Sequence, residues 1–362
     1  MGTGITIKGL VKRFGDKTII DHVSFDIAVG ELVCLLGPSG CGKTTTLRCI
    51  AGLEAPEEGR IEINGQPVFD SEAKLTVEPY RRNAGMVFQS YAIWPHLSVF
   101  ENVAFPLRVR RAPNAEVETR TMRALAMVGL ADFRTRSAQQ LSGGQQQRVA
   151  VARAIVYEPD VLLFDEPLSN LDARLRDATR AEIRRLQREL NVAAVYVTHD
   201  QAEALSLADR ILVMSEGRIH QAGTPQEIYA APRDAFVADV VGATNFLDIA
   251  VHTIGDTTVQ GVAPGGALVR ATGHMAAPGP ARVMVRPDRL RIAADSGDQR
   301  GENCMYGTVR QRLFLGGHYE YAVTVGPTTL RAFSPTEVAE GGRVAVSFAA
   351  SDCIVLETKD AS

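Results

Sequence analysis

Long hydrophobic runs, a strong charge of one sign and a paired set of cysteines are all missing from this chain of 362 residues. No apolar run approaches the roughly 18 residues that a membrane-spanning helix needs, and the first residues lack the apolar core and cleavage site of a secretory signal. The formal net charge is −3, which argues against a chain built mainly to bind nucleic acid. We therefore expect a globular protein that, if it works at a membrane, does so as a peripheral subunit.

The cysteines form no recognisable framework. There are five of them: Cys34, Cys41, Cys49, Cys304 and Cys353. Their number is odd, and their spacings match neither a zinc site nor a set of disulfides. We expect free thiols in a reducing compartment.

Residues 1–235 alternate short apolar stretches with amphipathic ones. The predicted strands are Glu31–Leu36, Val161–Asp165 and Ala193–Thr198. The predicted helices are Lys43–Gly52 and Ala178–Leu190. Alternation of this kind is typical of an α/β domain with a largely parallel sheet.

Residues 236–362 contain short alternating segments separated by glycine and proline, among them Arg343–Phe348. Val309–Leu315 and His318–Val325 flank a Gly-Gly pair, which predicts a hairpin because primed turns need positive φ. We expect this second part to be a small all-β domain, an OB-like barrel, after a linker at Pro232–Asn245. In the hairpin, one face should carry Leu313, Leu315, Tyr319, Tyr321, Val323 and Val325.

A phosphate-binding loop follows the first predicted strand. It reads Gly37-Pro38-Ser39-Gly40-Cys41-Gly42-Lys43-Thr44 and fits G-x-x-x-x-G-K-[ST] between a strand and a helix. The glycines let the backbone curl so that several N–H groups point at one phosphate cluster, and the helix N-terminus adds partial positive charge. We expect Lys43 to reach the β and γ phosphates of a nucleotide and Thr44 to offer its hydroxyl to Mg²⁺.

Two adjacent carboxylates end the predicted strand Val161–Asp165. The carboxyl ends of strands are where α/β folds bind ligands. Asp165 would hold Mg²⁺, and Glu166 would polarise the attacking water as a general base. The pattern is weak alone and becomes strong beside a phosphate-binding loop.

A second glycine-rich helix start lies at Ser142-Gly143-Gly144-Gln145. One interpretation is purely structural: Ser142 caps the helix and Gln145 closes a capping box. The other is a second contact for the γ phosphate, because a helix N-terminus attracts anions. Both can hold, since a well-capped helix is a good anion site.

The motif LSGGQQQR at Leu141–Arg148 resembles the signature of ABC-type ATPases, and four further segments agree with it in order. Gln89 in MVFQSYAIWPH resembles the glutamine-loop residue, and Asp172 in SNLDA resembles the D-loop aspartate. His199 in VYVTHD resembles the switch histidine, and Phe14 in KRFG the aromatic residue that stacks on adenine. Read singly, Phe14 would more often be a core aromatic, His199 would more often be a structural histidine at a strand end, and Gln89 would be a surface amide.

The resemblance implies roles for these residues. Glu166, His199 and Gln89 would be catalytic, and Thr44, Gln89 and Asp165 would hold Mg²⁺. ATP would be bound by Phe14, Gly37, Pro38, Ser39, Gly40, Cys41, Gly42, Lys43, Thr44, Thr45, Ser142, Gly143, Gly144, Gln145 and Asp172. In the family, two such domains bind head to tail, and each lends its signature to the other's ATP. The resemblance therefore implies a homodimer.

The family also implies partners and a location. We expect an ATPase domain at 1–235, with a helical subdomain at about 90–158, on the cytoplasmic face of the inner (plasma) membrane. It would drive two permease subunits and, indirectly, a periplasmic solute-binding protein. The apolar stretch Tyr91–Phe100 would meet the permease, or else form a local core of the subdomain.

Residues 236–362 resemble the accessory β domain of maltose, polyamine and ferric-iron importers, through Val283–Asp288. This region has 11 basic and 13 acidic residues, a net charge of −2 that argues against oligonucleotide binding. Ferric iron or polyamine is the expected substrate, with phosphonate or sugar as alternatives. Other interpretations are a soluble ABC-type ATPase of DNA repair or translation, and a regulatory ATPase that docks a signalling partner.

Overall fold

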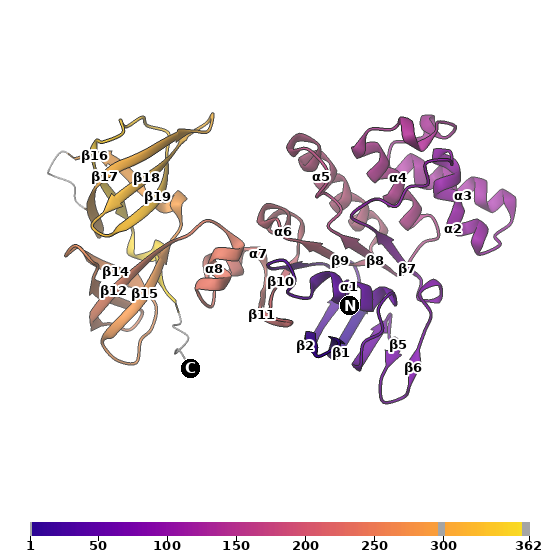
Figure 1. The fold of residues 1–362 in the computed structure, drawn as a ribbon, viewed down its shortest axis with the longest axis horizontal. Helices are drawn as coiled ribbons and strands as arrows, with labels where there is room; N and C mark the ends of the chain where they lie inside the picture. The colour runs from indigo at the N-terminus through magenta and orange to yellow at the C-terminus, as the bar shows by residue number, and fades with distance from the viewer. Residues whose placement is uncertain (1, 296–300, 357–362) are drawn as a thin grey trace. The chain divides into compact units, whose positions relative to one another are not determined.

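A computed structural model describes residues 2–295 and 301–356 and divides the chain into two compact units, Met1–Gln226 and Glu227–Ser362 (Figure 1). The division lies somewhat earlier in the chain than the boundary predicted between residues 235 and 236. In the described ranges, no helix is long and apolar enough to cross a membrane.

The first unit is built on a mostly parallel sheet with the strand order β11-β10-β3-β9-β8-β7. Its strands are β3 (Leu32–Leu36), β7 (Ala84–Val87), β8 (Val161–Asp165), β9 (Ala193–Thr198), β10 (Arg210–Ser215) and β11 (Arg218–Gly223). All neighbours pair in parallel except β10 and β11. Every residue of β3, β8 and β9 is buried, which explains their unbroken apolar sequences and confirms these predicted strands.

A second, antiparallel sheet runs in the order β2-β1-β4-β5-β6. Its strands are β1 (Thr3–Phe14), β2 (Lys17–Ala28), β4 (Glu58–Ile63), β5 (Gln66–Asp70) and β6 (Leu75–Thr76). Helix α1 (Lys43–Ala51) shares one apolar core with both sheets, in which Leu47 and Ile50 are fully buried beside Ile5 and Val33. The phosphate-binding loop therefore enters a helix held on two sides.

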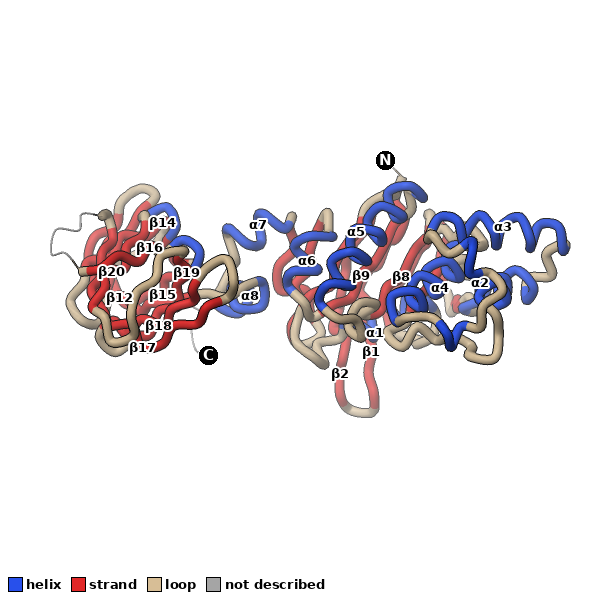
Figure 2. Tube along the Cα trace, turned by 90° about the horizontal axis from the view of Figure 1, so that it is seen from above, coloured by secondary structure: helices blue, strands red, loops and turns tan. Residues whose placement is uncertain are grey.

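Three helices form a separate layer at one side of the unit (Figure 2). They are α2 (Val99–Val109), α3 (Asn114–Met127) and α4 (Gly143–Ile155), and they fall within the predicted helical subdomain. Helices α5 (Ala173–Leu190) and α6 (Gln201–Leu207) complete the unit. Helix α5 begins before the predicted Ala178, because the Asp172 carboxylate accepts the Leu175 N–H at 3.0 Å and caps it.

The second unit holds a closed barrel, β12-β13-β14-β21-β15, and a sheet, β16-β20-β17-β18-β19, around one apolar core. Its strands are β12 (Asn245–Ile254), β13 (Thr258–Val262), β14 (Leu268–Thr272), β15 (Gly279–Val285), β16 (Arg291–Ala294), β17 (Asn303–Phe314), β18 (Tyr319–Val325), β19 (Thr328–Ser334), β20 (Arg343–Phe348) and β21 (Cys353–Val355). The predicted all-β domain is confirmed. The predicted linker is partly wrong, because Pro232–Asn245 contains α8 (Ala235–Val241), which follows α7 (Pro225–Ala230).

Arg286 fastens α8 to the end of β15. Its side chain is buried, and its Nη1 donates to the carbonyls of Ala238 and Gly242, each at 2.8 Å. Its guanidinium also lies 4.3 Å from the ring centroid of Tyr229. The Val-Arg-Pro element of the sequence thus has a structural use within this unit.

The predicted face of the β17–β18 hairpin is wrong. The pair Leu315–His318 flanks the two-residue turn, so Leu313 lies opposite Glu320 and shares its face. Leu313 is 46% exposed whereas Tyr321 is fully buried. Apolar alternation cannot be counted straight through a two-residue turn, because the residues flanking it point to the same side.

Candidate functional site

The phosphate-binding loop joins β3 to α1, and two of its glycines are required by close backbone approaches. A Cβ on Gly37 would lie 2.3 Å from the Met214 carbonyl oxygen, and one on Gly42 would lie 2.7 Å from that of Ile19. Both also have positive φ, 159° and 106°. The remaining members Pro38, Ser39 and Gly40 are exposed, and Thr45 is half-buried.

Lys43 is folded onto this loop. Its ammonium donates to the carbonyl oxygens of Gly37 and Pro38 at 2.7 and 2.9 Å, and lies 3.8 Å from the Sγ of Cys41. The side chain is 5% exposed, so this charge is poised beside the curled backbone rather than in solvent. Cys41 is itself buried, and all five cysteines are free thiols, as expected.

The two carboxylates at the end of β8 reach different partners. Asp165 accepts a hydrogen bond from the Thr44 hydroxyl at 3.0 Å, and burial raises the pKa of its carboxyl. Glu166 turns away with a φ of 43°, and its Oε2 lies 3.2 Å from Nδ1 of His199. The structure therefore brings together Lys43, Thr44 and Asp165, with Glu166 and His199 beside them.

Gln89 lies just after β7, with its side chain exposed. Its carbonyl accepts a hydrogen bond from Nδ2 of Asn170 at 2.8 Å. Asn170 belongs to the segment between Glu166 and Asp172, so the glutamine loop is tied to the chain that follows β8.

The signature segment has the predicted capping box. The Gln145 N–H donates to the Ser142 hydroxyl at 3.4 Å, and the Ser142 N–H donates to the Gln145 side chain at 3.0 Å. Gly143 and Gly144 face Leu171 and Leu175, and a Cβ added at either glycine would lie in ordinary contact with these leucines, at 3.4 to 3.8 Å. Within the described ranges, no hydrogen bond joins Ser142–Gln145 to the phosphate-binding loop of the same chain.

Two more predicted residues lie at the ends of elements. Asp172 is exposed and caps α5, as described above. Phe14 ends β1 with 51% of its surface exposed, and the Lys12 ammonium lies 4.9 Å from its ring centroid. An aromatic face this open is unlike a core residue and is available for stacking.

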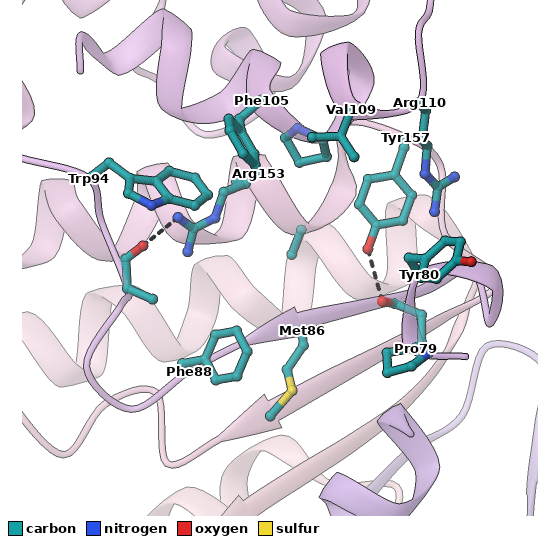
Figure 3. Close-up of a pocket in the computed structure, with 14 residues that line it drawn as sticks. Pro79, Tyr80, Met86, Phe88, Trp94, Phe105, Val109, Arg110, Arg153 and Tyr157 are labelled. Carbon is teal, nitrogen blue, oxygen red and sulfur yellow. Dashed lines mark hydrogen bonds between the residues drawn. The ribbon is translucent and has the colours of Figure 1, made fainter. Parts of the chain in front are cut away.

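A cleft of about 580 Å³ opens between the helical subdomain and the edge of the sheet (Figure 3). Its lining consists of Pro79, Tyr80, Ala84, Met86, Phe88, Ala92, Trp94, Phe105, Pro106, Val109, Arg110, Arg153, Ala154 and Tyr157. Trp94 packs on Phe105 with ring centroids 4.4 Å apart. At the other end, the Arg110 guanidinium lies 4.1 Å from the ring of Tyr157. The wall is thus aromatic with cationic edges.

The expected apolar surface at Tyr91–Phe100 is only partly present. Tyr91 is buried, at 7% exposure, whereas Trp94 lines the cleft. The local-core interpretation therefore holds for Tyr91, whereas contact of Trp94 with a permease stays a prediction.

Comparisons with known proteins identify the family of the chain. An ABC transporter family model matches residues 20–169, and a TOBE domain model matches residues 283–356. The chain is 44% identical over 323 residues to the spermidine/putrescine import ATP-binding protein PotA of Legionella pneumophila (strain Philadelphia 1), covering 88% of this chain and 86% of that protein. It is 47% identical over 327 residues to the Fe(3+) ions import ATP-binding protein FbpC of Rhizobium etli, covering 90% and 89%.

The chain belongs to the ABC transporter ATP-binding proteins. It is of the import type, an ATPase coupled to transport, and it carries a C-terminal accessory domain. Among solved structures it resembles cbiO1 from Clostridium perfringens, part of the ABC transporter complex cbiONQ. That match has a TM-score of 0.58 and 29% identity, and covers 64% of this chain and 92% of that one.

Three residues around this site, Glu203, Arg153 and Asn170, are not among the predicted site residues. Glu203 is 3% exposed and accepts hydrogen bonds from the hydroxyls of Tyr196 and Thr198 at 3.0 and 2.7 Å. It thereby anchors the strand that leads into His199. Arg153 and Asn170 hold the backbone around Gln89, and only coordinates reveal such contacts between distant segments.

Proposed function

We propose that this protein hydrolyses ATP at the interface of a head-to-tail homodimer and so drives solute import through two separate permease subunits. The observation that carries the proposal is the division of the phosphate-binding groups. Thr44, next to Lys43, is hydrogen-bonded to Asp165, which precedes Glu166 in the chain. In the described part of the chain, by contrast, the capped helix start at Ser142 makes no hydrogen bond to the phosphate-binding loop. A second copy would bring that helix start to the γ phosphate, and the two-fold symmetry would repeat the contact.

In this proposal the loop backbone and Lys43 bind the β and γ phosphates, and Phe14 stacks on the adenine. Thr44 and Asp165 fit Mg²⁺, because their oxygens already lie 3.0 Å apart and hard oxygen donors suit this ion. Gln89 would complete that set. When bound, Mg²⁺ neutralises charge on the phosphates.

Glu166 is the proposed general base. Its carboxylate is 20% exposed, so it can meet a water molecule, and His199 lies within 3.2 Å to hold it. Ser142, Gly143, Gly144 and Gln145 of the second copy would close over the γ phosphate, with Asp172 at the same interface. Loss of the γ phosphate would remove these charge-assisted hydrogen bonds and let the dimer open.

The apolar cleft is the proposed docking site for a cytoplasmic helix of the permease. Phe105 and Val109 are 41% and 61% exposed at its rim, on α2. An amphipathic helix laid in such a groove would bury them. A periplasmic solute-binding protein would act indirectly, through the permease, and the proposed place of work is the cytoplasmic face of the inner membrane.

Ferric iron or a polyamine is the proposed substrate class, because the relatives named above import these solutes. Phosphonate and sugar stay as alternatives, since the ATPase does not touch the cargo. We propose no nucleic-acid partner, because neither the whole chain nor the second unit carries excess positive charge.

Mixing two inactive variants tests the shared site. Lys43→Ala removes one half of each site and Ser142→Arg the other. A mixed dimer then has one site with both halves intact. ATPase activity should return on mixing, whereas a site built within one chain would stay inactive in the mixture.

The docking proposal is tested by Phe105→Asp. This variant should keep basal ATPase activity in solution but fail to co-purify with permease subunits from membranes. Co-purification with ribosomes or DNA ends in place of membrane subunits would favour the soluble, non-transport alternative.

A further inference from the structure

Two consecutive residues after Gln89 have a backbone that side chains disfavour. Tyr91 and Ala92 have φ values of 60° and 47°. Residues with a Cβ rarely adopt this left-handed region, and a bulky aromatic residue does so only where its surroundings impose it. The turn therefore needs an external hold.

Arg153 supplies that hold from α4. Its Nη1 donates to the Ala92 carbonyl at 2.6 Å (Figure 3). Its Nη2 donates to the Tyr91 carbonyl at 2.7 Å, and the residue is 7% exposed. Burial lowers the pKa of Arg153 to about 10, so the guanidinium is still charged at neutral pH. Both bonds are charge-assisted, and the two nitrogens of one planar group fix the two carbonyls together.

We propose that Arg153 is a positioning residue that holds the strained turn Tyr91–Ala92 and thereby sets the place of Gln89 in the ATPase site. This inference rests on the proposed function and deepens it. Gln89 is fixed from its other side by Asn170, through the 2.8 Å bond to its carbonyl. In this proposal Arg153 acts on the site through the turn, by way of its bonds to the two carbonyls.

The same side chain also reaches the cleft. The guanidinium lies 4.8 Å from the ring centroid of Trp94, which packs on Phe105. A permease side chain that enters the cleft at this end would therefore contact the Arg153–Trp94 pair, and Arg153 is the member that holds the turn. Because Arg153 belongs to the helix that begins at Gly143, one residue joins the cleft, the Gln89 segment and the signature helix.

The alternative role for Arg153 is packing within the helical subdomain. The two roles are distinguished by asking whether a glycine in the turn restores the activity that is lost when Arg153 is replaced. Arg153→Met keeps the apolar stem and removes both hydrogen bonds. We expect kcat to fall about ten-fold, because the turn is no longer held, with KM for ATP within about two-fold of the parent. Ala92→Gly in the same chain should restore part of kcat, because glycine adopts positive φ without a clamp at one of the two strained positions.

The matched control is Lys74→Gly. Lys74 is exposed and has a φ of 52°, so glycine relieves the same kind of strain between β5 and β6, away from the cleft lining. It should restore nothing in the Arg153→Met chain. Equal rescue by both glycines, or rescue by neither in a folded protein, would assign Arg153 to packing and overturn the proposal.

A second readout does not depend on activity. Trp94 is the single tryptophan of the chain, so acrylamide quenching of its fluorescence reports on this turn alone. Quenching should rise in Arg153→Met and fall back with Ala92→Gly but not with Lys74→Gly. Unchanged quenching and unchanged kcat in Arg153→Met would also overturn the proposal.

Misfolding of the variant and inactivity of the parent protein each need a separate test. If Arg153→Met does not fold, as judged by circular dichroism, the same rescue is tested in Arg153→Lys, which keeps the charge and loses the two-pronged geometry. If the parent protein itself shows no ATPase activity, the proposed function fails, and the Trp94 quenching pattern alone decides whether Arg153 holds the turn.

Discussion

Replacing Glu166 by glutamine is the sharpest test of the proposed chemistry. Glutamine has the same shape, and the backbone at this position is fixed by the bond from the Glu166 N–H to the Val197 carbonyl at 3.1 Å. The variant should therefore keep the site intact and lose only the basic carboxylate. General-base catalysis contributes about 10² to 10⁴ in rate, so kcat should fall by that factor, about 3 to 5 kcal/mol of activation free energy.

The contact between Glu166 and His199 refines this prediction. Since Oε2 and Nδ1 lie only 3.2 Å apart, the two residues should act as a unit. The double variant Glu166→Gln/His199→Ala should then lose no more activity than Glu166→Gln alone. Losses that multiply would show that His199 works independently of Glu166.

The assay is phosphate release at saturating ATP, together with ATP binding and gel filtration. Glu166→Gln should bind ATP normally and accumulate as an ATP-bound dimer. The matched control is Glu158→Gln, because Glu158 is exposed and also has a positive φ, 55°, yet lies outside the site. Near-normal hydrolysis by Glu166→Gln would refute the general-base assignment.

Three further variants test other parts of the structure. Lys43→Ala should weaken ATP binding itself by at least about ten-fold, measured by calorimetry, and unchanged affinity would contradict the role of the loop. The stability of Glu203→Gln relative to the parent should increase as the pH rises above 4.5, the ordinary pKa of a glutamate carboxyl. Burial raises the pKa of the Glu203 carboxyl in the folded protein, so the parent loses stability as the pH rises from 4.5 through this raised pKa, whereas the variant has no carboxyl to ionise. A difference in melting temperature that does not grow with pH would contradict this. Arg286→Met should destabilise the second unit by about 3 kcal/mol, because it leaves buried carbonyls unpaired. Arg282→Met, which breaks only an exposed pair with Asp248, should cost about 1 kcal/mol or less, and equal losses in urea unfolding would remove the special role of Arg286.

The sequence predicts best those parts whose physics is local. The buried strands β8 and β9 have unbroken apolar runs, and the Ser142–Gln145 capping box depends on residues three positions apart. Both can therefore be predicted from the sequence alone. The family motifs likewise name the residues around the phosphate-binding loop.

Other features depend on register or on distant contacts. The face of Leu313 is decided by how the turn before His318 closes, which alternation alone does not encode. Arg153 reads as one more basic residue of an amphipathic helix. Its role could not be predicted, because it depends on hydrogen bonds to the carbonyls of Tyr91 and Ala92, which are distant in the sequence.

The capping box limits which residues can occupy position 142. The Ser142 oxygen accepts the Gln145 N–H with one of its two lone pairs, and the hydroxyl proton stays available to donate. In the proposed dimer, one atom would thus close its own helix and offer a proton to the other copy's phosphate. Aspartate would cap equally well but would bring a negative charge and no proton, and alanine would supply neither. Asparagine is also neutral, but it would cap with its oxygen and donate with its amide nitrogen, whereas a hydroxyl does both with one atom.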